Sequence, residues 1–104
     1  MNLSYTSAVI LQAVAAGAEY GFTIIELTGL PSGTVYPALR RLEDARYVRA
    51  QWESEGKAHK EGRPARRYYE ITSAGSRALA EALKRYRLLA RTPLPNPEEE
   101  KGNA

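Results

Sequence analysis

The sequence predicts one small domain that is mainly helical and carries a single two-stranded β-hairpin. Three observations support this fold class. Apolar residues recur at helical spacing in the N-terminal half, the residues after Tyr47 alternate between apolar and polar as in a strand, and a further helical pattern follows them. A length of 104 residues is enough for one compact core and too short for two.

The N-terminal part predicts two helices followed by glycines. The first covers residues 3–18, which are rich in alanine, and either Ser4 or Thr6 can cap its N-terminus. Its shared apolar face consists of Leu3, Ile10, Ala13 and Val14. The second helix covers about residues 22–27 and ends at Gly29, because glycine readily adopts the left-handed conformation that closes many helices.

A third, longer helix is predicted from about residue 32 to residue 46. Ser32 is its expected N-cap, since a serine hydroxyl can accept from a free backbone N–H in the first turn. Its inner face consists of Val35, Ala38, Leu39, Leu42 and Ala45, and its outer face of Tyr36, Arg40 and Asp44. Pro37 has no N–H to donate, so we expect a distorted first turn or a slightly later start.

A hairpin is predicted after the third helix. The alternating residues of its first strand are Val48, Ala50 and Trp52 against Arg49, Gln51 and Glu53, the period of a half-buried strand. Residues 54–64 are polar with two glycines and predict the loop, and residues 66–71 predict the returning strand. We interpret Trp52, Tyr68 and Tyr69 as core and cross-strand packing rather than as a surface for stacking bases.

A final helix is predicted from residue 73 to about residue 91, capped by Thr72 or Ser73. Its apolar stripe consists of Leu79, Ala82, Leu83, Tyr86, Leu89 and Ala90. Prolines follow it, and we expect residues 92–104 to form a disordered tail. Three helices, a hairpin and a last helix, in this order, make a winged helix-turn-helix domain.

The composition argues against several classes of site. Without cysteine, the chain can form no disulfide and no zinc site with thiolate ligands. The longest apolar stretch, residues 8–18, is too short to cross a bilayer and lacks the basic flank of a signal peptide, so we expect a cytoplasmic protein without membrane contact. His59 is the single histidine, and the carboxylates show no pairing pattern. We therefore expect no enzymatic activity, no cofactor and no metal.

Basic residues concentrate in the middle of the chain. Residues 40–67 contain nine Lys and Arg against five Asp and Glu, in a chain of net charge +3. Such a surplus suits a phosphate backbone, and the second helix of a helix-turn-helix unit fits the major groove of double-stranded DNA. The expected DNA contacts are Ser32, Thr34, Tyr36 and Arg40 in the groove, with Lys60, Arg63 and Arg66 of the hairpin on the backbone. The alternatives are a three-helix core with a solvated outer face and an edge hairpin guarded by charges.

The last helix carries more apolar surface than so small a core can cover. We expect a second copy of the chain to cover it, because a symmetric homodimer also matches a twofold-symmetric DNA site. The expected interface residues are Leu79, Leu83, Tyr86 and Leu89. The chain would then consist of a DNA-binding domain (residues 1–72) and a dimerisation helix (residues 73–91). The alternatives are a helix folded back on its own domain and a protein-interaction module that pairs this helix with another protein.

Three stretches of the sequence agree in order and spacing with one known family. They are GF at residues 21–22, SGTVYPALRRLE at residues 32–43, and GRP at residues 62–64 followed by RRYY, IT and AG. In these stretches, and over roughly residues 3–90, the chain closely resembles the PadR family of bacterial transcriptional regulators.

The resemblance implies a winged-helix dimer, usually a repressor, whose last helix forms the dimer contact. It also implies that Pro37 is accommodated inside the recognition helix and that the chain is of the short type, with a single C-terminal helix. Several members release DNA when a small aromatic compound binds, some in a pore between the protomers. In this chain Tyr5 and Tyr86 are the residues placed to contribute to such an effector pocket. Where the family often has a histidine, this chain has Tyr20.

Overall fold

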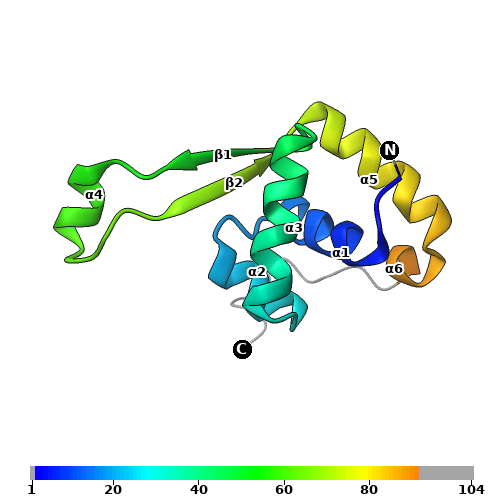
Figure 1. Cartoon of the computed structure of the whole chain (residues 1–104), viewed down its shortest axis with the longest axis horizontal. Helices are drawn as coiled ribbons and strands as arrows, with labels where there is room; N and C mark the ends of the chain where they lie inside the picture. The colour runs from blue at the N-terminus through cyan, green and yellow to red at the C-terminus, as the bar shows by residue number, and fades with distance from the viewer. Residues whose placement is uncertain (1, 92–104) are drawn as a thin grey trace.

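The computed structural model describes residues 2–91, which form a helical body with one projecting hairpin (Figure 1). Its elements are α1 (Tyr5–Ala15), α2 (Gly21–Thr28), α3 (Ser32–Asp44), β1 (Val48–Trp52), α4 (Glu55–Lys60), β2 (Arg67–Ile71), α5 (Ser73–Arg85) and α6 (Arg87–Arg91). The predicted fold class, mainly helical with one two-stranded antiparallel hairpin, is confirmed. The predicted tail of residues 92–104 lies outside the described residues.

Helix α1 lies at the centre of the body, in contact with α2, α3, α5 and β2. Its small side chains allow these close approaches, since Ala8 and Ala13 are fully buried. The largest fully buried side chains of the chain are Ile10, Leu11, Ile24, Leu39, Leu42, Val35 and Val48. The apolar face predicted for the first helix is therefore the centre of the hydrophobic core.

The ends of α1, α2 and α5 follow the signals in the sequence. The side chain of Ser4 accepts from the backbone N–H of Ser7 at the start of α1. Gly29 ends α2 in the left-handed region, with φ of 73°. Thr72 accepts from the N–H of Gly75 and so caps α5.

The start of α3 differs from the prediction. Pro31, rather than Ser32, occupies the N-cap position, and no side chain caps the helix. The fixed backbone of Pro31 directs its carbonyl to the N–H groups of Thr34 and Val35, at 2.9 and 3.0 Å. The bond to Thr34 spans three residues, as in a 3₁₀ turn, so the first turn of α3 is tightened. The helix nevertheless begins at Ser32 and continues through Pro37. Pro37 lies on the exposed side, where water can solvate the carbonyl that its missing N–H leaves free.

The loop predicted for residues 54–64 instead contains the short helix α4 at the outer end of the hairpin (Figure 1). The hydroxyl of Ser54 accepts from the N–H of Lys57 at 3.2 Å, and Ala58 is buried. An acidic residue lies in the first turn and basic residues lie in the last turn, an arrangement that the helix dipole favours. A helix this short has no apolar period to detect in a sequence.

The two strands pair in antiparallel register, from Val48 opposite Ile71 to Trp52 opposite Arg67. The predicted alternation holds at first but reverses at the end of β1. Trp52, expected in the core, is 63% exposed, whereas Glu53, expected in solvent, is only 7% exposed. Of the three aromatic residues assigned to packing, Tyr69 is buried and Tyr68 is half-buried. Trp52 is not in the core, but its ring packs across the strands under the guanidinium of Arg67, 5.5 Å from the ring centroid.

The final helix is not continuous. It breaks at Tyr86, whose backbone leaves the helical region with ψ of 80°, and α6 turns back toward the core. The hydroxyl of Tyr86 donates to the carbonyl of Leu3 at 2.8 Å, and Leu89 of α6 is 5% exposed. Residues of both α5 and α6 therefore belong to the core of the body, and the two helices do not extend away from it as one continuous helix.

None of the helices within residues 2–91 has the length and apolar character that crossing a membrane requires.

Gly75 shows how tightly α5 approaches the segment between α3 and β1. A Cβ atom at this position would overlap the backbone carbonyl of Tyr47 and lie 2.9 Å from Cγ1 of Ile71. We expect Gly75→Ala to lower the free energy of unfolding by about 1–3 kcal/mol, the usual cost of overpacking. Urea titration followed by circular dichroism measures this change.

Gly33→Ala is the matched control, because Gly33 also lies in the first turn of a helix but has no atom within 4 Å of an added Cβ. It should be neutral or stabilising, since alanine is the better helix former. An equal loss in both variants would contradict the close approach at Gly75.

Candidate nucleic-acid interface

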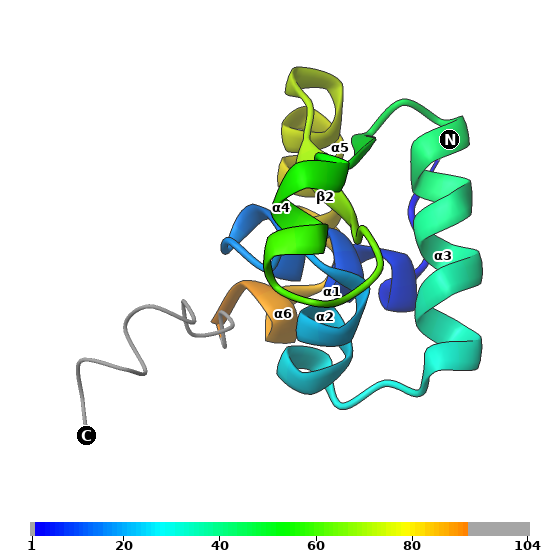
Figure 2. The same cartoon turned by 90° about the vertical axis from the view of Figure 1, so that its left-hand side faces the viewer.

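The outer face of α3 is uncovered. Viewed along the hairpin, α3 lies at one edge of the body, with no other element on its outer side (Figure 2). Its inner face is buried through Val35, Ala38, Leu39 and Leu42. Of the residues predicted to enter a DNA groove, Ser32, Tyr36 and Arg40 are exposed and Thr34 is half-buried. These four residues therefore occupy the N-terminal part and outer side of one uncovered helix.

Tyr36 is held against the first turn of α2. Its ring lies so close to Gly21 that a Cβ there would come within 2.6 Å of the tyrosine Oη. Tyr36 nevertheless keeps 46% of its surface exposed. The glycine thus lets the ring pack on α2 while the outer part of the side chain remains accessible.

Arg66 lies on a pair of aromatic rings beside Tyr36. The rings of Tyr20 and Phe22 stack with their centroids 5.5 Å apart. The guanidinium carbon of Arg66 lies 4.9 Å from the Phe22 centroid and 5.6 Å from that of Tyr20, within the range of cation–π attraction. Within residues 2–91 no carboxylate pairs with Arg66, so its charge is not neutralised there.

Two adjoining hollows lie between the hairpin and α3. The first, of about 220 Å³, is lined by Tyr20, Gly21, Phe22, Tyr36, Arg66, Arg67 and Tyr69. The second, of about 320 Å³, is lined by Tyr36, Arg40, Glu43, Asp44, Arg67 and Tyr69. Arg67 belongs to both and is fixed by an ion pair with Glu43 of α3 at 2.6 Å. The fold therefore brings Tyr36 and Arg40 of α3 together with Arg66, which lies in the segment just before β2.

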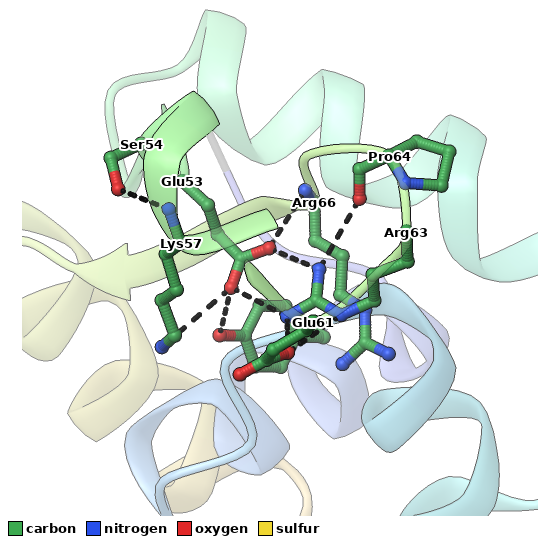
Figure 3. A network of polar contacts seen from close by, with 8 residues as sticks. Glu53, Ser54, Lys57, Glu61, Arg63, Pro64 and Arg66 are labelled. Carbon is green, nitrogen blue, oxygen red and sulfur yellow. Dashed lines mark hydrogen bonds and ion pairs between the residues drawn. The ribbon is translucent and has the colours of Figure 1, made fainter. Parts of the chain in front are cut away.

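Arg63, expected on a DNA backbone, points into the protein (Figure 3). Both of its terminal nitrogens donate to the carboxylate of Glu53, and the guanidinium also pairs with Glu61. Only 18% of the Arg63 side chain and 2% of the Glu53 side chain are exposed. The charge of Arg63 is therefore paired with two carboxylates of the hairpin itself.

The carboxylate of Glu53 also accepts hydrogen bonds from groups other than Arg63 (Figure 3). The backbone N–H of Arg66 donates to Oε1 at 2.9 Å, and the hydroxyl of Tyr20 donates to Oε2 at 3.1 Å. The ammonium group of Lys57 lies 3.7 Å from Oε2. We call Glu53, Arg63, Tyr20 and the N–H of Arg66 the Glu53 network. It connects the end of β1, the segment before β2 and the segment before α2.

The network changes the pKa values of its members. Hydrogen bonds from Arg63 hold the pKa of Glu53 at about 2, against an ordinary value of 4.5, although burial alone would raise it. Burial raises the pKa of Tyr20, and its hydrogen bond to Glu53 adds to the effect. The hydrogen bonds that Arg63 donates to Glu53 also raise the pKa of Arg63.

The remaining predicted contact of the hairpin, Lys60, is exposed at the end of α4. Helix α4, which ends at Lys60, lies at the outer end of the hairpin, away from α3 (Figure 1). Of the seven expected contacts, Ser32, Tyr36, Arg40 and Lys60 are thus exposed, and Thr34, Arg63 and Arg66 are half-buried.

The residues predicted for a dimer interface have unequal exposure. Leu79 and Leu89 are 9% and 5% exposed, so their own chain already covers them. Leu83 and Tyr86 are half-buried. Leu88, which a continuous helix would place off the apolar stripe, is 69% exposed because the break at Tyr86 reorients α6.

The two tyrosines predicted for an effector pocket do meet. The rings of Tyr5 and Tyr86 pack edge to face, with centroids 5.3 Å apart and planes at 86°. Tyr5 is 45% exposed. In residues 2–91 no group of three or more potential metal-ligating His, Asp or Glu side chains occurs.

Sequence reasoning missed three residues of this region. The strand alternation predicts Glu53 on the solvent side, and Tyr20 enters only as a departure from a family pattern. Phe22 belonged to a recognised pair, but its role as a platform for Arg66 depends on stacking that no local pattern indicates.

The sequence matches the model of the Transcriptional regulator PadR-like family over residues 10–81. No curated protein matches it significantly.

The fold is similar to several solved structures. A PadR family transcription regulator from Clostridium difficile has a TM-score of 0.69 at 22% identity, with 85% of this chain and 93% of that chain covered. A transcriptional regulator from Clostridium thermocellum has a TM-score of 0.68 at 23% identity, covering 84% of each chain. Pex from Synechococcus has a TM-score of 0.57 at 29% identity, covering 83% of this chain and 84% of that one.

The Glu53 network makes part of the stability dependent on pH. Because the folded pKa lies below the ordinary value, the stabilisation is fully present above about pH 4.5 and is lost as the pH falls toward 2. The difference in unfolding free energy between the parent chain and Glu53→Gln should therefore be constant above pH 4.5 and shrink below it. Urea titrations at a series of pH values measure this difference.

Glu81→Gln is the control, because Glu81 pairs with Lys84 on an exposed helix face, where ion pairs contribute little. Its difference from the parent chain should be small at every pH. A difference for Glu53→Gln that is equally flat from pH 7 to pH 2 would count against the network.

Proposed function

The chain belongs to the transcriptional regulator PadR-like family, and on that premise we propose that it is a sequence-specific regulator that binds double-stranded DNA as a homodimer. Helix α3 enters the major groove, and the hairpin follows the phosphate backbone as the wing. The observation that carries this proposal is the uncovered outer face of α3 beside a wing arginine without an acidic partner in residues 2–91.

The dimensions of α3 suit a groove reader. Its 13 residues span about 20 Å, and a major groove about 12 Å wide accepts a helix of this kind. Ser32 and Thr34 lie in its first turn, where the N–H groups before Thr34 can donate to phosphates; the N–H of Thr34 itself bonds the carbonyl of Pro31. Tyr36 and Arg40 lie one turn apart on the exposed side, within reach of base edges or of the flanking backbone.

The basic residues outside α3 contribute affinity more than specificity. Arg66 lies beside Tyr36, and Lys60 lies at the outer end of the wing. A cation that neutralises a phosphate releases counterions, which strengthens binding to every DNA sequence and makes it depend on salt. Specificity then depends on Ser32, Thr34, Tyr36 and Arg40, as predicted from the sequence.

A twofold dimer completes the proposal. Leu88 and the half-buried Leu83 and Tyr86 give the α5–α6 region an apolar surface, on which a second copy would bury Leu88. Leu79 and Leu89 would support this surface from the core. Two symmetry-related α3 helices would read the halves of a twofold-symmetric operator.

Repression and release by an effector extend the same proposal. A dimer bound across a promoter excludes polymerase, so we assign the chain a repressor role. The edge-to-face pair of Tyr5 and Tyr86 adjoins the proposed dimer surface and offers aromatic faces to a small aromatic effector. If another protein bound Leu88 instead, the chain would be an interaction module, and its mass in solution distinguishes the two.

The first test concerns Tyr36. We expect Tyr36→Ala to weaken binding to duplex DNA from upstream of the protein's own gene by about 10- to 100-fold, the scale of one specific contact. Binding to a scrambled duplex should change much less. Fluorescence anisotropy at fixed salt measures both affinities.

Tyr36→Phe is the matched control, because it keeps the ring over Gly21 and removes only the hydroxyl. If Tyr36→Ala weakens both duplexes equally, Tyr36 is a packing or phosphate residue and the groove-reading surface is misplaced.

The second test concerns the dimer. Light scattering of the parent chain should give about twice the 11.5 kDa chain mass, and Leu88→Glu should reduce it to one chain mass, because the interface would bury the new charge. Gln51→Glu adds the same charge on the exposed wing and should leave the dimer intact. A dimer that survives Leu88→Glu would exclude this surface.

A further inference from the structure

The interior position of Arg63 conflicts with a phosphate contact. To reach DNA, its guanidinium would have to leave the carboxylate of Glu53, whose side chain is 2% exposed. That carboxylate would then remain buried without its main partner, which is strongly unfavourable. Lys57 offers only a distant ammonium at 3.7 Å, and its own side chain is 56% exposed. Arg63, although it lies in the wing, is therefore unsuited to contact DNA directly.

Glu53 instead connects the wing to the groove-reading surface through Arg66. The two residues face each other beyond the last strand pair, with the N–H of Glu53 donating to the carbonyl of Arg66 at 2.8 Å. The N–H of Arg66 returns a bond to the Glu53 carboxylate at 2.9 Å. The backbone of Arg66 is thus fixed on both sides by one residue.

The side chain of Arg66 is fixed through a second route. The Tyr20 hydroxyl donates to Glu53, and the Tyr20 ring stacks on Phe22 to form the platform beneath the Arg66 guanidinium. Glu53 therefore holds both the backbone of Arg66 and one of the two rings on which its side chain lies. Arg63 holds Glu53 in place through a bidentate ion pair, in which both terminal nitrogens donate to the carboxylate. The ammonium group of a lysine could not form this pair of bonds.

We propose that Glu53 and Arg63 are positioning residues for DNA binding, which orient Arg66 toward a backbone phosphate while Arg63 itself contacts none. This inference rests on the proposed function. It gives Arg63, the arginine of the GRP turn, a role different from the one that its charge and position in the wing suggest. The ordering of Arg66 before DNA arrives lowers the entropy cost of the contact.

The salt dependence of DNA binding separates a contact from a positioning role. Arg66→Ala should lower the slope of log affinity against log salt by about one unit, because one phosphate contact is lost. Arg63→Ala should weaken binding by roughly tenfold through lost preorganisation but leave the slope unchanged. Fluorescence anisotropy on one duplex at four or more salt concentrations gives both numbers.

Lysine variants supply a second, independent readout. Arg66→Lys should retain the slope and most of the affinity, because lysine also binds phosphate. Arg63→Lys should behave like Arg63→Ala, because lysine cannot pair with Glu53 through two parallel bonds. Glu53→Gln combined with Arg63→Ala should weaken binding no more than Arg63→Ala alone, since both remove the same interaction.

The free protein tests the network without DNA. Trp52 is the only tryptophan, is adjacent to Glu53 and is 63% exposed, so its fluorescence anisotropy reports motion of the wing. That anisotropy should fall in Arg63→Ala and in Glu53→Gln but not in Glu61→Gln, which removes the more exposed partner of Arg63. Circular dichroism melting shows that each variant used is folded at the temperature of measurement.

Each outcome has one meaning. A slope lowered by one unit in Arg63→Ala and restored in Arg63→Lys would make Arg63 a phosphate contact and overturn the inference. Unchanged affinity and unchanged Trp52 anisotropy in Arg63→Ala would overturn it as well. A parent chain that binds no duplex would contradict the proposed function, and the Trp52 measurements would still decide whether Glu53 and Arg63 order the wing.

Discussion

A buried carboxylate needs partners, and this constraint shapes the wing. Glu53 follows β1 immediately, so its burial brings the end of that strand, the turn at Arg63 and the start of β2 to one point. The hydroxyl of Tyr20 ties the same point to the helical body. A two-stranded hairpin by itself is only marginally stable in water. The Glu53 network therefore supplies order at the part of the wing that the hydrophobic core does not reach.

Helix α3 has a buried face and an exposed face. Its inner face fills the core against α1, and its outer face is uncovered. The helical period of the apolar residues agrees with the buried positions of α3, because Val35, Leu39 and Leu42 lie on one face and are all buried. Pro37 is tolerated because it belongs to the outer face, where the free carbonyl meets water. The wing completes the surface by placing Arg66 beside Tyr36.

Helices α5 and α6 bury most of their apolar side chains against the body of the same chain. One continuous helix would have carried Leu89 beyond the body, whereas the break at Tyr86 returns it to the core at the cost of exposing Leu88. The hydrogen bond from Tyr86 to the backbone of Leu3 anchors this turn across the N-terminus. Most of the predicted stripe is thus used within one chain, and the exposed remainder is what the proposed dimer would cover.

The sequence by itself determined the elements whose signals are local: the alanine-rich α1, the glycine end of α2, the amphipathic α3 and the start of α5. It left two candidates for the cap of α1 and two for the cap of α5, and the structure selects Ser4 and Thr72. The sequence also identified exposed residues of α3, because helical period alone separates Tyr36 and Arg40 from the core. Only the tertiary structure decided the inward turn of Arg63, the exposure of Trp52 and the break at Tyr86. Each of these depends on a partner far away in the sequence or on where the core ends, and no local pattern records either.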